Sequence, residues 1–244
     1  MNLALQCFDA MDARLLAEGP VWYVAFLFSL TCHEAAHALV AKWGGDLTAF
    51  RGGQVTLNPI PHIRRELFGT VIVPILSYVV GGWMIGWGSA PYDPVWQYRH
   101  PRRAAWMAFA GPLANIALLV LAAVVIHVGL FAGILIPSQT LRFTRVVGGA
   151  SAGFAGGLAT FLSILFSLNL LLATFNLLPI PPLDGNTAVG LLLNEEGARR
   201  FARFSHNRTL ALIGLLIGWK IFPYIFGPVF GLSLNLIYPG MVYR

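Results

Sequence analysis

Five long apolar runs constrain this chain more than any other feature. They cover about residues 20–43, 68–90, 104–132, 154–178 and 209–238. A helix needs roughly 20 mostly apolar residues to cross a bilayer, and each run is long enough. Only 11% of the residues are charged, whereas soluble domains carry about 25%. The sequence therefore predicts an all-α polytopic membrane protein with about four to six membrane helices.

The domain organisation follows from what the chain lacks. No repeat or low-complexity linker divides it, so we expect a single membrane domain over residues 1–244. The first twenty residues carry mostly acidic charge and no basic leader, which argues against a cleavable signal peptide. The last run is interrupted by Pro223 and Pro228, which fits either a kinked helix or a tight hairpin.

The first apolar run contains three ionisable residues within five positions, His33, Glu34 and His37. A charge at the bilayer centre costs about 2.5–3.5 kcal/mol, so such a group indicates function. Histidines four residues apart share one helix face and can present two ring nitrogens to one zinc ion. Glu34 lies beside that face and can take a proton from a bound water. This is the His-Glu-x-x-His pattern of zinc hydrolases.

Asp184 is the other acid embedded in apolar sequence, at the end of Asn176-Leu-Leu-Pro-Ile-Pro-Pro-Leu-Asp184. Its three prolines forbid continuous helix, and unwound backbone at membrane depth is tolerated where it lines a cavity. Catalytic zinc needs a third protein ligand. Asp184 is therefore the predicted third ligand, the alternative being a turn at the membrane surface.

With these residues the chain resembles the site-2 protease family of intramembrane zinc metalloproteases, in its compact bacterial branch without a PDZ or CBS domain. The resemblance rests on four motifs spread along the chain: His33–His37, Gly53–His62, Gly111-Pro112-Leu-Ala-Asn115 and Asn176–Gly185. It places the helix that carries the His-Glu-x-x-His pattern, here called the motif helix, at about 20–43. It places the segment that carries the third ligand at about 154–193. It also implies one zinc ion per chain, held by His33, His37 and Asp184, with Glu34 as the general base.

The resemblance implies roles for further polar residues. Asn176 matches the asparagine that holds substrate backbone, although a helix-packing amide is the alternative. The segment 53–59, which includes Asn58, alternates like a short strand and would pair with an unwound substrate. Asn115 would contact the ligands rather than the zinc ion itself. We expect His62 to be structural rather than a ligand.

Zinc binding requires the motif helix and Asp184 to meet at one depth. Simple alternation of the five runs puts them on opposite sides, whereas a re-entrant hairpin over 68–90, turning at Gly81–Gly82, brings them together. Two very short helices there are the alternative. With Lys220 and Arg244 left out of the count, the hairpin leaves only Arg14, Arg142 and Arg145 on the far side. It gathers eleven basic residues on the near side: Lys42, Arg51, Arg64, Arg65, Arg99, Arg102, Arg103, Arg199, Arg200, Arg203 and Arg208. The positive-inside rule then predicts an N-terminus outside and a site opening toward the cytoplasm.

The predicted function is zinc-dependent hydrolysis of peptide bonds in or near the transmembrane segments of membrane protein substrates. We expect a multi-pass protein of a bacterial inner membrane, with the lipid bilayer and a substrate helix as partners. A metal-binding membrane protein without proteolysis, such as a zinc carrier or scaffold, would not need Glu34. A transporter would show repeated halves. The basic and aromatic residues of 199–208 fit an interfacial helix on anionic lipid better than nucleic acid.

Overall fold

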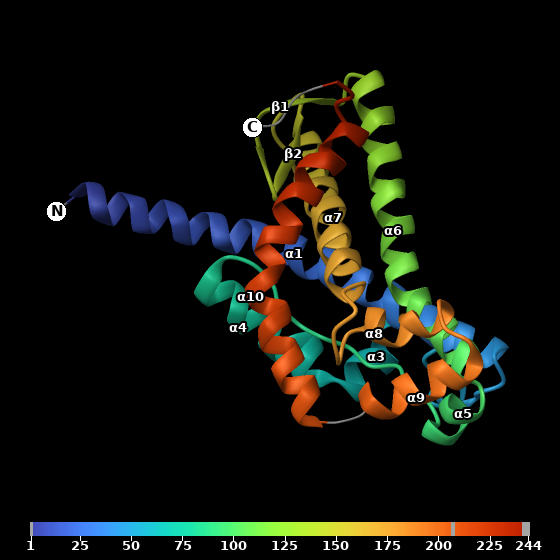
Figure 1. Cartoon of the computed structure of the whole chain (residues 1–244). Coiled ribbons are helices and arrows are strands. Elements are labelled where there is room, and N and C mark those ends of the chain that lie inside the picture. The colour runs from blue at the N-terminus through green and yellow to red at the C-terminus, as the bar shows by residue number, and fades with distance from the viewer. Residues whose placement is uncertain (1, 206–207, 241–244) are drawn as a thin grey trace.

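Four long apolar helices form the body of the molecule (Figure 1). The computed structural model describes residues 2–205 and 208–240, with the backbone alone at 2–16, 202–205 and 208. The long helices are α1 (Asn2–Trp43), α6 (Pro101–Phe131), α7 (Phe154–Asn176) and α10 (Arg208–Ser233). Each contains a stretch long and apolar enough to cross a membrane. The protein is an integral, multi-pass membrane protein, as predicted.

Short elements gather at the two ends of this bundle (Figure 1). One end holds α2 (Thr48–Arg51), α3 (Pro59–Arg65), α5 (Pro94–Arg99), α8 (Asp184–Ala188), the 3₁₀ turn Val189–Leu191 and α9 (Glu195–Ser205). The other end holds the hairpin of β1 (Leu135–Arg142) and β2 (Arg145–Gly149), and the 3₁₀ turn Leu234–Leu236. The antiparallel register pairs Leu135 with Gly149 and Arg142 with Arg145.

The prediction of a strand at 53–59 is wrong, because these residues form bends and turns up to the start of α3. Side chains there bond to the nearby backbone and bend it, which competes with strand pairing. The Thr56 hydroxyl accepts from Asn58 N at 3.1 Å, and Asn58 caps α3 by accepting from Ile60 N at 3.0 Å. The only strands among the described residues are instead β1 and β2, in the loop between α6 and α7.

The run 68–90 enters the structure as a helix and returns without one. A π-helical turn (Phe68–Ile72) leads into α4 (Val73–Gly81), which ends at Gly82 in the left-handed region, φ 73°. The chain then runs back, so that Trp87 N donates to Gly69 O at 3.0 Å. The predicted hairpin with its turn at Gly81–Gly82 is therefore present, and no second short helix forms. The last run is a single helix, α10, with both prolines inside it.

The core lies where α1, α6 and α7 pack together. Its largest cluster joins α6, α7 and the β-hairpin around Phe166 and Ile126, and a second joins α1, α4 and α7 around Trp22 and Phe26. Helix α10 is peripheral, with 11% of its apolar stretch buried against 61% for that of α1. This packing places the C-terminal half of α1 against α6 and α7, which is where its buried polar residues lie.

Candidate metal centre

Three predicted ligands meet in one place, between α1 and the start of α8. The Nε2 atoms of His33 and His37 lie 3.0 Å apart. Asp184 Oδ2 lies 3.1 Å from His33 Nε2 and 3.4 Å from His37 Nε2. Both histidines are buried, with 5% and 6% of their surface exposed. Among the described residues this is the only such group of histidine, cysteine and acidic side chains.

The geometry of these atoms fits a tetrahedral zinc ion. Zinc bonds of about 2.0–2.1 Å place neighbouring ligand atoms about 3.3 Å apart, close to the three distances above. Two histidines and one carboxylate are also a donor set of catalytic zinc sites, which keep a fourth position for water or substrate. The residues present therefore fit this ion.

Hydrogen bonds behind the histidines determine which ring nitrogen faces the centre. His33 Nδ1 lies 2.6 Å from Asn115 Oδ1, and His37 Nδ1 lies 2.7 Å from the Met107 carbonyl. Both partners accept, so each Nδ1 carries the proton and each Nε2 presents a lone pair. Three acceptor atoms then converge, and Asp184 Oδ2 is buried without a hydrogen-bond donor among the described residues. A cation at the centre would satisfy all three atoms.

A buried polar network holds Asn115 in this orientation. Its Nδ2 donates to Asn169 Oδ1 at 2.8 Å, and Asn169 Nδ2 donates to the Ser29 hydroxyl at 2.9 Å. Asn115, Asn169 and Ser29 are completely buried, on α6, α7 and α1. The structure thus places Asn115 directly behind His33, and the network connects all three packed helices.

Gly111 of α6 forms the wall of the centre. A Cβ atom at this position would lie 2.3 Å from His37 Nε2 and 2.6 Å from His33 Nε2. These separations are close to zinc–nitrogen bonds. The space in front of the two imidazoles therefore exists because residue 111 has no side chain.

Glu34 lies against the returning part of the hairpin. It is 5% exposed, and a Cβ atom at Gly88 would lie 2.8 Å from its Cγ and 2.9 Å from its Oε1. The adjoining Ser89 is held from two sides, because its carbonyl accepts from Gln54 Nε2 and its hydroxyl donates to Glu66 Oε1. The hairpin thus fixes the position of the Glu34 carboxylate by packing.

Asp184 reaches the centre because the segment that precedes it is not helical. Helix α7 ends at Asn176, and residues 177–183 contain the three prolines that prevent its continuation. Gly185 lets this loop fold tightly, since a Cβ there would lie 2.3 Å from the Leu177 carbonyl oxygen. Burial opposes ionisation of Asp184, but the positive charge on His37, when its imidazole is protonated, lowers the pKa of the carboxyl below its ordinary value. Asp184 therefore presents a carboxylate.

The remaining predicted residues lie in different settings. Asn176 is half-buried at the end of α7, and its side chain has no hydrogen-bond partner in the described part of the chain. Asn58 is exposed and caps α3. His62 is buried in α3, with Nε2 3.1 Å from the Thr56 carbonyl, and does not join the ligand group. Residues 206–207 of the basic segment 199–208 lie outside the described residues.

Sequence reasoning missed several contributors to the site. Gly111 belongs to a recognised motif, but its sequence indicates only close helix approach and not a position against both histidines. Met107 acts through its backbone, which leaves no trace in residue type. Tyr92 carries the weakest signal, a single aromatic between prolines; burial and then the charge of Asp184 raise the pKa of its phenol, so it stays protonated near the carboxylate.

Together the fold and the site define a membrane protein with a candidate metal-dependent hydrolytic centre. The model of peptidase family M50 matches residues 21–219, and the chain belongs to this family. The resemblance to site-2 proteases is thereby confirmed.

Named relatives agree with this assignment. The chain is 36% identical over 169 residues to "Putative zinc metalloprotease YwhC" of Bacillus subtilis (strain 168), covering 68% of this chain and 66% of that protein. It is 33% identical over 193 residues to "Putative zinc metalloprotease Rip2" of Mycolicibacterium smegmatis, covering 79% and 64%. The chain thus spans about two thirds of the length of these relatives. No solved structure matches it.

Proposed function

We propose that this protein is a zinc-dependent intramembrane endopeptidase that cuts membrane proteins in or near their transmembrane segments. One observation carries the proposal: within a membrane-spanning helix, His33 and His37 converge with Asp184 on one point, and Glu34 stands beside them. A site that only stored or carried metal would not need a buried glutamate at that position. Family membership and the zinc metalloprotease names of the relatives support the same conclusion.

The residues of the chain divide the work of hydrolysis. His33, His37 and Asp184 would hold zinc, which when bound polarises the scissile carbonyl and lowers the pKa of water to about 7. Glu34 accepts the proton of the attacking water and returns it to the leaving amine. The Asn176 amide can donate to a substrate carbonyl and accept from a substrate N–H. Asn115 and the Met107 carbonyl keep both imidazoles in the neutral, ligating tautomer.

The end of the bundle that carries the centre also supports an orientation. Helices α2, α3, α5 and α9 and the N-terminus of α6 lie at one end, and the β-hairpin with Arg142 and Arg145 lies at the other (Figure 1). The basic residues therefore gather near the metal centre. By the positive-inside rule, the centre opens toward the cytoplasm of a bacterial cell, with the protein in the inner membrane.

The first experiment is the zinc content of the detergent-purified protein, compared with that of His37→Ala and Asp184→Ala. We expect about one zinc per wild-type chain and a large loss in both variants. Cleavage of a membrane-spanning test substrate in vesicles then follows, with Glu34→Gln beside the wild type. Glu34→Gln should retain zinc and lose cleavage. Full zinc retention by Asp184→Ala would contradict the ligand set, and undiminished cleavage by Glu34→Gln would contradict the mechanism.

A further inference from the structure

Lys220 is a charged residue in the middle of a membrane helix, and the metal centre does not use it. Its span covers Thr209–Leu236, and at 1.5 Å per residue Lys220 lies about 16 Å along the helix from Thr209. The hydrocarbon core is about 30 Å thick, so this is close to its centre. A lysine side chain is much shorter than the distance to either surface, and snorkelling does not bring the ammonium group to water.

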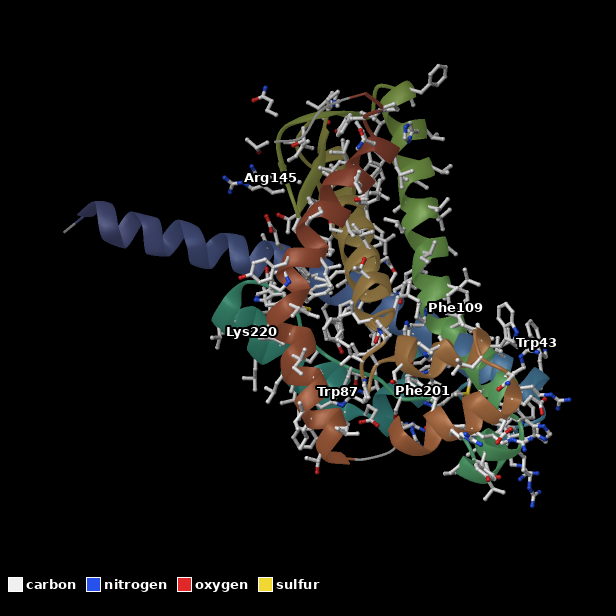
Figure 2. All side chains as sticks on the ribbon, viewed as in Figure 1. Trp43, Trp87, Phe109, Arg145, Phe201 and Lys220 are labelled. Carbon is white, nitrogen blue, oxygen red and sulfur yellow. The ribbon has the colours of Figure 1, made fainter. Side chains whose placement is uncertain are left out.

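Lys220 is unpaired in the part of the chain that the structure describes. It is exposed, and it forms no ion pair or hydrogen bond among the described residues. The inward face of α10 is a different one, where Gly214 lies against the Pro181 carbonyl and Gly218 near Leu183. Figure 2 shows Lys220 on the side of α10 away from α6. The charge therefore points out of the bundle, away from the loop that carries Asp184.

The surface around Lys220 is shaped for another helix. Tyr224, Gly227 and Gly231 follow Lys220 at helical positions i+4, i+7 and i+11, which share one face. Tyr224 is 81% exposed, and a Cβ at either glycine would meet no atom within 4 Å. Small residues spaced four apart let membrane helices approach closely. We call the face formed by Lys220, Tyr224, Gly227 and Gly231 the outer face of α10.

We propose that the outer face of α10 binds a transmembrane helix of another membrane protein, one that carries an aspartate or glutamate at the depth of Lys220. An intramembrane charge is stabilised by an opposite charge, so a carboxylate is the complement of Lys220. A second copy of this chain does not supply this carboxylate. The four spans contain two acids: Glu18, which lies near one end of its span, and Glu34, which is buried beside the metal centre. The partner is held and not cut on this face, because the face points away from the metal centre.

The probe is a synthetic leucine- and alanine-rich transmembrane helix with one central aspartate, labelled for energy transfer. It is titrated against the labelled full chain in phosphatidylcholine vesicles. Every protein sample carries Glu34→Gln, so that cleavage and binding stay separate. We expect association with the aspartate helix, about tenfold weaker for Lys220→Met. Lys220→Glu should reverse the preference, binding a helix with a central lysine instead.

Two glycine variants test the shape of the face. Gly227→Ile should weaken binding of the aspartate helix, and Gly157→Ile, at an equally open helical glycine of α7, should not. Equal zinc content in all samples shows that they fold alike. The control probe is the same helix with leucine in place of the aspartate. The proposal would be overturned if the two helices bound equally, if neither bound, or if Lys220→Met bound the aspartate helix as well as the wild type.

Discussion

At the scale of single residues, two glycines decide what the centre can do. Gly111 leaves space for an ion in front of His33 and His37, and Gly88 leaves space for the Glu34 carboxylate. Neither contributes an atom to chemistry. Each matters because a side chain would occupy the space of a functional group, so each glycine can be tested with a single methyl group.

Gly111→Ala should empty the centre without removing a ligand. The added methyl would stand 2.3 Å from His37 Nε2, where the ion must bind. We expect the affinity for zinc to fall by about 100-fold or more. Removing a residue that hydrogen-bonds to a metal ligand costs about 10–100-fold, and here the ion's own space is filled. Elemental analysis after dialysis against a graded zinc buffer measures this. Gly157→Ala, in open space, is the matched control; equal affinity in both variants would contradict the role of Gly111.

Gly88→Ala should leave zinc in place and slow cleavage. Its methyl would displace the Glu34 carboxylate, and misplacement by about 1 Å can cost about 100-fold in rate. We expect kcat to fall with little change in KM or zinc content. In a Glu34→Asp background, whose side chain is shorter, the same substitution should have little further effect. A large additional loss there would show that Gly88 acts elsewhere.

At the scale of elements, sequence reasoning succeeded for long features and failed for short ones. Apolar runs and the four-residue histidine spacing are local properties, so the spans and the pairing of the two histidines were predictable. The strand at 53–59 failed because Thr56 and Asn58 bond to their own backbone. The β-hairpin at 135–149 was missed because its register depends on packing against α7. Gly88 was not recognised because its contact joins residues far apart in the sequence.

The contact between α10 and the loop before Asp184 is the element-scale feature open to test. A side chain at Gly214 would meet the Pro181 carbonyl oxygen at 2.2 Å and Ile180 Cγ2 at 2.8 Å. Gly214→Val should therefore push α10 from this loop and disturb Asp184. We expect a lower midpoint of thermal unfolding and weaker retention of zinc than for Gly157→Val. Unchanged values for both quantities would show that the loop does not depend on α10.

At the scale of the whole molecule, the hairpin of 68–90 sets the topology. Because this segment returns to the end it came from, α1 ends and α6 begins at the same end of the bundle (Figure 1). Helix α7 then also ends there, which brings Asp184 to the histidines. The convergence of His33, His37 and Asp184 therefore depends on a segment that supplies none of the three residues.

Single cysteines introduced at exposed positions test this arrangement in intact cells. In a background with Cys7 and Cys32 replaced by serine, cysteines in 93–103 and 199–205 should react alike toward a membrane-impermeant reagent. Cysteines in 138–145 should behave oppositely. With the centre toward the cytoplasm, only the last group reacts from outside. Opposite reactivity of the first two segments would disprove the topology.

The network around α1 also bears on how the protein is made. The polar residues of α1 contact residues that lie much later in the sequence. His33 contacts Asn115, His37 contacts the Met107 carbonyl, and both histidines contact Asp184. Chains are synthesised from the N-terminus, so α1 enters the bilayer before any of these partners exists. A nascent chain that stops after α1 would carry Glu34 and both histidines into lipid unsatisfied. Helix α1 therefore enters the bilayer before its partners and reaches its final position only after them.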